Sequence, residues 1–153
     1  MRGYEVEAYN DNQVHEIDFD EVENVAFPPK GSTTPPFITP PHSLAHTFKF
    51  KSYAPKIFKQ LREFFDIDPV DYMQSVCGDY NYLEFISNSK SGQFFFYSHD
   101  GKYMLKTQTK EENKFLKRIL PQYFRYLKEN PHSLLVRILG ESAPSSSSLP
   151  CPR

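Results

Sequence analysis

Between residues 55 and 78 the spacing of apolar residues predicts two consecutive helices. Apolar side chains from Ile57 to Phe65 form one stripe at helical spacing, and Pro55 ahead of them suits a first helical position. A second helix is expected to begin with Asp68 as N-cap and Pro69 in its first turn, and to end at Gly78. The lysines and arginine of the first helix lie off its apolar stripe, so one face is apolar and the other is basic.

A longer helical stripe follows in the last third of the chain. Thr109 and Glu112 have the spacing of a capping box, and apolar residues recur at helical intervals over 115–127. Pro121 falls inside this stripe, so the pattern predicts two helices in series. The apolar run Leu134–Leu139 predicts a buried strand.

Between these helical parts the pattern is that of strands, expected over Tyr82–Ile86, Phe94–Ser98 and Lys102–Thr107. Asp100-Gly101 predicts a two-residue hairpin turn of type I′, which places Phe95 opposite Lys106 and Tyr97 opposite Met104. The predicted fold class is α+β, with an antiparallel sheet of about five strands and helices packed on it.

Composition predicts one folded domain with flexible ends. The 153 residues are 39% hydrophobic, and the aromatic content of 16% is that of a globular core. Residues 1–20 are acidic and expected to be flexible, residues 21–140 are expected to form the domain, and residues 141–153 read as a disordered Ser/Pro-rich tail. The Pro-rich stretch from Pro28 to His42 reads as a linker by composition alone.

Charge is distributed unevenly along the chain. The net charge is −1, yet residues 1–26 hold eight acidic residues and one basic residue, whereas residues 44–140 hold fifteen basic and ten acidic residues. A basic domain suits a phosphate-rich partner. A net basic charge, however, more often reflects only a solvated surface. The chain shows no apolar run long enough to cross a bilayer and no secretory signal at its start, so a cytoplasmic location is expected.

The candidate chemistry lies in the loop 87–93 and in the strand after it. Small residues in the loop allow backbone N–H groups to approach an anion, and Lys90 adds charge, although most such loops are simple turns. Lys106 lies in an apolar strand and needs a partner if it is buried, for which Glu112 and Glu111 are the candidates. The alternative is an edge-strand lysine whose ammonium reaches water.

Other functional classes have little support. The five histidines show no metal-ligand spacing, and His99 is expected to be exposed on the hairpin. Cys77 is expected to be a core thiol on an apolar helix face. RNA stacking on Phe94–Phe96 is conceivable, but a run of phenylalanines beside helices is more often core, and no nucleic-acid partner is expected.

Several blocks, taken in order, resemble one known family. They are Phe27-Pro28-Pro29-Lys30-Gly31-Ser32, Thr39-Pro40-Pro41-His42, Phe48 to Pro55 with the helix after it, Asp71-Tyr72-Met73, Lys90-Ser91-Gly92-Gln93-Phe94-Phe95, Met104-Leu105-Lys106-Thr107, and Glu112 with Leu120-Pro121-Gln122-Tyr123. From about Glu21 to Gly140 the chain resembles the amino-terminal lobe of the phosphatidylinositol-phosphate kinases. The resemblance implies a kinase small lobe, with the Pro-rich stretch as a strap on it.

The resemblance also implies the site residues and the ligand. Lys106 would hold the phosphates of ATP, Lys90, Ser91 and Gly92 would line the phosphate loop, and Glu112 would orient the lysine. The family activity is ATP-dependent phosphorylation of phosphatidylinositol 4-phosphate on the 5-position, at the cytosolic face of membranes.

By the same resemblance, the catalytic aspartate, the Mg²⁺-binding aspartate and the activation loop belong to a carboxyl-terminal lobe that these 153 residues do not contain. No catalytic residue is therefore assigned, and the chain alone is expected to be inactive. The alternative is a non-catalytic lobe that forms a homodimer or binds an anionic phosphoinositide membrane surface through the helix from Pro55 to Phe65.

Overall fold

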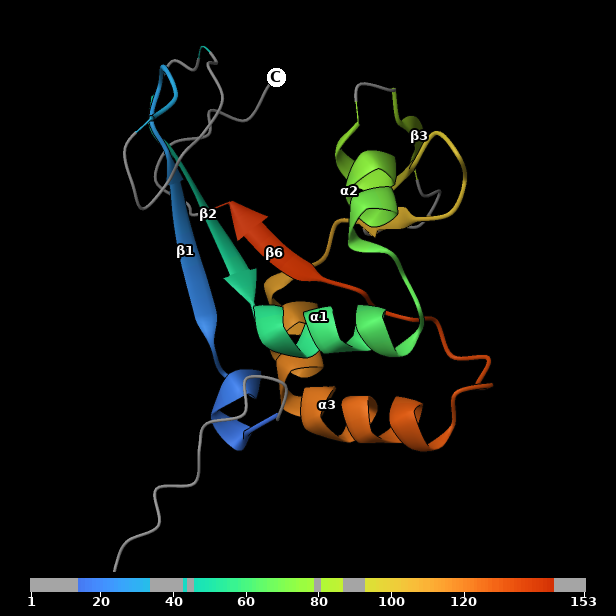
Figure 1. The fold of residues 1–153 in the computed structure, drawn as a ribbon. Helices are drawn as coiled ribbons and strands as arrows, with labels where there is room; N and C mark the ends of the chain where they lie inside the picture. Colours follow the sequence, from blue (N-terminus) through green and yellow to red (C-terminus); the bar gives the residue numbers. More distant parts are fainter. Residues whose placement is uncertain (1–13, 34–42, 44–45, 79–80, 87–92, 145–153) are drawn as a thin grey trace, which may run out of the picture. The chain divides into compact units, whose positions relative to one another are not determined.

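The computed structural model describes residues 14–33, 43, 46–78, 81–86 and 93–144 (Figure 1). The α+β class is confirmed, but the strands form two three-stranded antiparallel sheets instead of one sheet of about five. The chain divides into two compact units, residues 1–57 with 140–153, and residues 58–139. The Pro-rich segment 34–42 lies outside the described residues.

The sheet of the first unit has the order β1 (Val22–Phe27), β2 (Phe48–Tyr53) and β6 (Glu141–Pro144). β6 pairs with β2 through residues 50–53, so the prediction of a disordered tail from residue 141 is wrong for Glu141–Pro144. A strand of polar and small residues carries little periodic signal, and its backbone is ordered by pairing with a strand about ninety residues earlier. Residues 145–153 lie outside the described residues.

The first unit also contains a short 3₁₀ helix, Glu16–Phe19, within the segment expected to be flexible. Asp18 in this helix is buried, and its carboxylate lies 3.3 Å from Nζ of Lys56 and accepts a hydrogen bond of 2.7 Å from the His15 amide. Burial raises the pKa of Asp18, but the His15 and Lys56 contacts outweigh it and hold the pKa below its ordinary value. Part of the 1–20 segment therefore has a defined structure.

The two predicted early helices are confirmed as α1 (Pro55–Phe64) and α2 (Pro69–Cys77). Oδ1 of Asp68 accepts hydrogen bonds from the backbone of residues 70 and 71, at 2.8 and 2.9 Å, as the N-cap of α2. The prediction that Cys77 is a core thiol is wrong, because its side chain is exposed in the last turn of α2. Ser75 is the buried residue of this short helix.

The sheet of the second unit has the order β3 (Leu83–Ile86), β4 (Phe94–Tyr97) and β5 (Met104–Lys106). The predicted hairpin register is confirmed, with Phe95 opposite Lys106 and Tyr97 opposite Met104. The predicted type I′ turn is wrong, since φ is positive at Gly101 (+70°) but not at Asp100. A type I′ turn requires positive φ at both positions.

The side chain of Asp100 explains the turn that forms instead. The amide of Gly101 donates to Ser98 O, and the amide of Ser98 donates to Tyr103 O, each at 2.9 Å, so four residues separate the ladder partners. Oδ1 of Asp100 accepts hydrogen bonds of 2.7 Å from the Ser98 hydroxyl and 3.2 Å from the Lys102 amide. An aspartate whose carboxylate accepts hydrogen bonds from its own turn stabilises that turn without adopting the left-handed conformation.

The helix α3 (Lys110–Glu129) continues through Pro121 as a single helix, so the predicted break at this proline is wrong. Its buried side chains lie on both sides of the proline, at Leu116, Leu120, Phe124 and Leu127. Tertiary burial along the whole stripe outweighs the one backbone hydrogen bond that proline removes. The predicted capping box at its start is confirmed.

The prediction of a buried strand over Leu134–Leu139 is wrong. These residues form no strand, and the side chain of Leu134 is fully exposed. Side chains satisfy the backbone here: the Tyr123 hydroxyl accepts from the Ile138 amide at 2.8 Å and donates to Val136 O at 2.7 Å, and Arg62 donates to Leu139 O. The apolar run predicted that these residues would be buried in a strand, but they do not join either sheet.

Candidate phosphate-binding site

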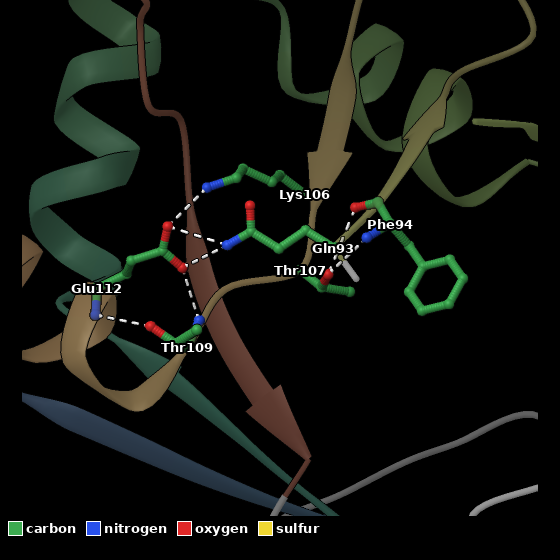
Figure 2. A network of polar contacts seen from close by, with 6 residues as sticks. All are labelled: Gln93, Phe94, Lys106, Thr107, Thr109 and Glu112. Carbon is green, nitrogen blue, oxygen red and sulfur yellow. Dashed lines mark hydrogen bonds and ion pairs between the residues drawn. The ribbon is translucent and has the colours of Figure 1, made fainter. Parts of the chain in front are cut away.

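A polar network joins the end of the β4–β5 hairpin to the first turn of α3, within the second unit (Figure 2). Lys106, the last residue of β5, points its ammonium toward Glu112, with 3.0 Å between Nζ and Oε1. Of the two glutamates that the sequence offered as partners, Glu112 is the one that forms the ion pair. The side chains of Lys106 and Glu112 are 38% and 41% exposed, so the pair lies at the surface and is open to a ligand.

The capping box brings Glu112 to this position. The amide of Glu112 donates to the Thr109 hydroxyl at 3.2 Å, and the amide of Thr109 donates to Oε2 of Glu112 at 2.7 Å. This reciprocal arrangement draws the carboxylate back to the start of the helix. Because only two residues separate the end of β5 from Thr109, the carboxylate meets the lysine at the end of the strand.

Gln93 is the third member of the network, and sequence reasoning assigned it no role beyond the loop. Its Nε2 donates to both oxygens of Glu112, at 3.0 and 2.8 Å (Figure 2). Gln93 directly precedes β4, and Thr107 directly follows β5 opposite Phe94. The sequence held a signal for this position. Extending the predicted hairpin register outward by one more residue pair would have placed Gln93 beside the start of α3.

The strand ends next to this network are closed by Thr107. Its amide donates to Phe94 O at 3.0 Å, and its hydroxyl accepts from the Phe94 amide at 2.9 Å. The amide of Phe94, the first residue of β4, is thus satisfied by a side chain, and its carbonyl by a backbone amide. This closure holds Gln93 and Lys106 on neighbouring strands.

The surroundings of Glu112 keep its carboxyl ionised. The hydrogen bond from the Thr109 amide is the largest cause, and the bonds from Lys106 and Gln93 add to it, so the pKa falls from 4.5 to about 2. The site at neutral pH therefore holds a carboxylate and an ammonium. A lysine has three N–H donors, and Glu112 accepts one of them, which leaves donors for the oxygens of a phosphate.

The predicted loop residues Lys90, Ser91 and Gly92 lie outside the described residues. Within the described part of the chain, no three His, Cys, Asp or Glu side chains gather closely enough to hold a metal ion. The structure thus brings together Lys106 and Glu112 from the predicted set, and adds Gln93, Thr107 and Thr109.

Protein kinases also contain an ion pair between a strand lysine and a helix glutamate. Residues 76–143 match the family model described as phosphatidylinositol-4-phosphate 5-kinase. The matched part includes the whole network and continues past residue 140, where the resemblance was expected to end. Over this stretch the chain is homologous to the phosphatidylinositol-4-phosphate 5-kinase family.

The chain is similar to several curated proteins of Arabidopsis thaliana. It is 41% identical over 124 residues to phosphatidylinositol 4-phosphate 5-kinase 4, which covers 80% of this chain and 15% of that protein. It is 39% identical over 130 residues to phosphatidylinositol 4-phosphate 5-kinase 3, covering 84% of this chain and 18% of that protein. For phosphatidylinositol 4-phosphate 5-kinase 9 the identity is 43% over 116 residues, with 76% and 14% covered. The chain thus spans less than a fifth of the length of these relatives.

Proposed function

We propose that this chain is the nucleotide-binding lobe of a phosphatidylinositol-phosphate kinase. The observation that carries the proposal is the ion pair between Lys106 and Glu112 at the end of β5. In protein kinases such a strand lysine contacts the nucleotide phosphates and is held by a helix glutamate. Lys106 would hold phosphates of ATP, Glu112 would orient it, and Lys90, Ser91 and Gly92 would line the loop.

The proposed reaction of the whole protein is phosphoryl transfer from ATP to phosphatidylinositol 4-phosphate, giving the 4,5-bisphosphate. The names of the similar proteins support this substrate. The 153 residues by themselves are proposed to bind ATP without transferring its phosphoryl group. Transfer requires bound Mg²⁺ and a positioned nucleophile, and by family resemblance the residues for both lie in the carboxyl-terminal lobe.

Binding of ATP to the 153-residue polypeptide, measured by titration calorimetry, tests the proposal. We expect the wild type to bind and Lys106→Met to weaken binding at least tenfold, because the variant keeps the length of the side chain but loses its charge. Lys102→Met is the matched control, since Lys102 lies near the other end of the hairpin and pairs with Asp100 at 3.5 Å. Equal binding by the wild type and Lys106→Met would refute the assignment. Transfer of labelled phosphate to phosphatidylinositol 4-phosphate by this polypeptide would refute its inactivity.

A second function that we propose is binding to an anionic membrane surface, through α3 instead of α1. Each cationic side chain of α1 has a partner: Lys56 pairs with Asp18, Lys59 lies 3.8 Å from Glu63, and Arg62 donates to a backbone carbonyl. This arrangement weakens the prediction that the helix from Pro55 to Phe65 meets a membrane.

Six cationic residues of α3 recur at spacings that place them on one face, over about 27 Å of helix. They are Lys110, Lys114, Lys117, Arg118, Arg125 and Lys128, with Glu111 and Glu129 at the edge of the stripe. Five of the six are exposed, and each contributes about 1 kcal/mol near an anionic surface.

Sedimentation with vesicles tests this second function. We expect binding to vesicles that contain phosphatidylserine, no binding to neutral phosphatidylcholine vesicles, and loss of binding in the double variant Lys114→Glu, Arg118→Glu. Lys59→Glu on α1 is the control and is expected to bind as the wild type does. If the double variant still binds and Lys59→Glu does not, the membrane-binding surface would lie on α1 and not on α3. A homodimer stays a prediction, which sedimentation equilibrium tests.

A further inference from the structure

The carboxylate of Glu112 is held by more than its lysine. Oε1 accepts from Lys106 and from Gln93, each at 3.0 Å, and Oε2 accepts from Gln93 at 2.8 Å and from the Thr109 amide at 2.7 Å. Three of these four hydrogen bonds come from neutral donors, two of them from one side-chain amide. Both oxygens of Glu112 therefore keep a partner when Lys106 is taken away.

The two kinds of donor differ in how firmly they are placed. Lys106 carries a compact charge on a flexible four-carbon stem, which moves readily between partners. Gln93 is half-buried and directly precedes Phe94, whose backbone pairs with that of Thr107. Thr109 is the N-cap of α3. The neutral donors thus lie directly before β4 and α3 on a backbone amide or a shorter side chain, whereas the cation lies at the end of a longer, flexible stem.

A lysine that binds phosphate through its remaining donors still depends on the position of its glutamate. If Lys106 were the sole support of Glu112, the attraction of Lys106 to a phosphate would leave the carboxylate free to adopt other rotamers, and the lysine would lose its orienting partner. The contact of Gln93 with both oxygens resists that, because hydrogen bonds to an ionised carboxylate are stronger than those between neutral groups.

We propose that Gln93 is a positioning residue, whose side-chain amide holds the Glu112 carboxylate in place so that Glu112 orients Lys106 toward the phosphate of a nucleotide. This inference rests on the proposed binding of ATP by Lys106. Gln93 contacts the orienting glutamate and not the phosphate, so it acts through Glu112. It couples the beginning of β4 to the first turn of α3.

The test uses the full 153-residue chain with Gln93→Met, which keeps the length of the side chain and removes its donors, and Gln93→Glu, which adds a repelling carboxylate. Gln122→Met, at an exposed position of α3, is the matched control. Two quantities are measured: the ATP dissociation constant, and the midpoint of the Glu112 side-chain carboxyl titration by NMR without ligand. The folded state of each variant is checked by its thermal transition.

We expect Gln93→Met to weaken ATP binding by roughly three- to tenfold and to raise the Glu112 midpoint toward the ordinary glutamate value. Gln93→Glu is expected to have a larger effect on both, and Gln122→Met none. In Lys106→Met the Glu112 midpoint is expected to stay well below the ordinary value, because Gln93 and Thr109 still donate. A merely structural role of Gln93 would lower the thermal transition without changing the ATP affinity of the folded variant.

The outcomes separate this inference from the function on which it rests. If ATP binds in a Lys106-dependent way and Gln93→Met matches the wild type in affinity and in the Glu112 midpoint, the role of Gln93 is refuted and the proposed function stands. If the wild type does not bind ATP, the proposed function fails, and the role of Gln93 in phosphate binding fails with it. If Gln93→Met does not fold, the same two measurements are made on Gln93→Glu. An ATP dissociation constant and a Glu112 midpoint equal to those of the wild type would then refute the inference.

Discussion

The hydroxyl of Ser75 donates to Oδ1 of Asp100 at 2.7 Å, and this bond ties the end of α2 to the tip of the β4–β5 hairpin. The same oxygen accepts from the Ser98 hydroxyl at 2.7 Å. The ring of Tyr72 on α2 meets the ring of Tyr103 edge to face, with 5.0 Å between centroids. A polar contact and an aromatic contact thus join the two elements side by side.

The buried hydroxyl of Ser98 is expected to be important for stability. It is inaccessible to solvent, donates to Asp100 and accepts from the Tyr103 amide at 3.0 Å, so Ser98→Ala leaves a partly buried N–H without its acceptor. We expect the free energy of unfolding to fall by about 1–3 kcal/mol in urea denaturation. Ser43→Ala, at an exposed position, is the control and should leave the midpoint unchanged. Equal midpoints for the two variants would show that the hairpin tip forms differently in solution.

The left-handed conformation of Gly101 predicts a backbone cost for any side chain there. A Cβ placed on Gly101 meets nothing within 4 Å, so a substitution brings strain without a clash. Gly101→Ala is expected to lower the free energy of unfolding by about 1 kcal/mol, and Gly101→Asn by less, because asparagine tolerates this region better. Thermal denaturation of the three proteins checks the order. An alanine variant as stable as the wild type would contradict the positive φ of +70°.

The lowered pKa of Glu112 predicts a loss of stability in acid. A carboxyl whose pKa is about 2 when folded and 4.5 when unfolded stabilises the protein fully above 4.5, and this contribution is lost as the pH falls toward 2. The difference in unfolding free energy between the wild type and Glu112→Gln should therefore shrink across this window. Taking the difference cancels the contribution of Asp100, whose pKa is also held low by the hydroxyls of Ser98 and Ser75. A difference that does not vary with pH would mean that Glu112 lacks these donors in solution.

Truncation to alanine is expected to change the free energy of unfolding much more at one leucine of the second unit than at another. Leu120 on α3 is buried, whereas Leu134 is fully exposed. Leu120→Ala should cost about 2–5 kcal/mol through lost burial and the cavity that remains. Leu134→Ala should change the free energy of unfolding by less than about 0.5 kcal/mol. Chemical denaturation of both variants compares them, and a large loss for Leu134→Ala would show that the segment after α3 is buried in solution.

Local chemistry determined much of the second unit in advance. The N-cap at Asp68, the capping box of Thr109 with Glu112 and the register that sets Phe95 opposite Lys106 all follow from residues close together in the chain. The capping box and the hairpin also bring Lys106 within reach of Glu112, one of the two partners that the sequence offered for it.

Contacts between distant residues decided the rest. The strand Glu141–Pro144 exists because β2 offers it a pairing edge, and α3 passes through Pro121 because its stripe is buried on both sides. Leu134–Leu139 forms no strand, although its apolar run suggested one. The turn at Asp100 follows from the acceptors that its carboxylate provides to Ser75 and Ser98.

The sequence by itself therefore determined the helix caps and the hairpin register, because each depends on hydrogen bonds between near neighbours. It offered Glu111 and Glu112 as partners of Lys106, and the structure decided for Glu112. The tertiary structure alone decided the two-sheet arrangement, the course of α3 and the place of Gln93, whose amide reaches a carboxylate nineteen residues away. The periodicity of a segment shows that it has an apolar face, but burial and pairing depend on what the rest of the chain brings against that face.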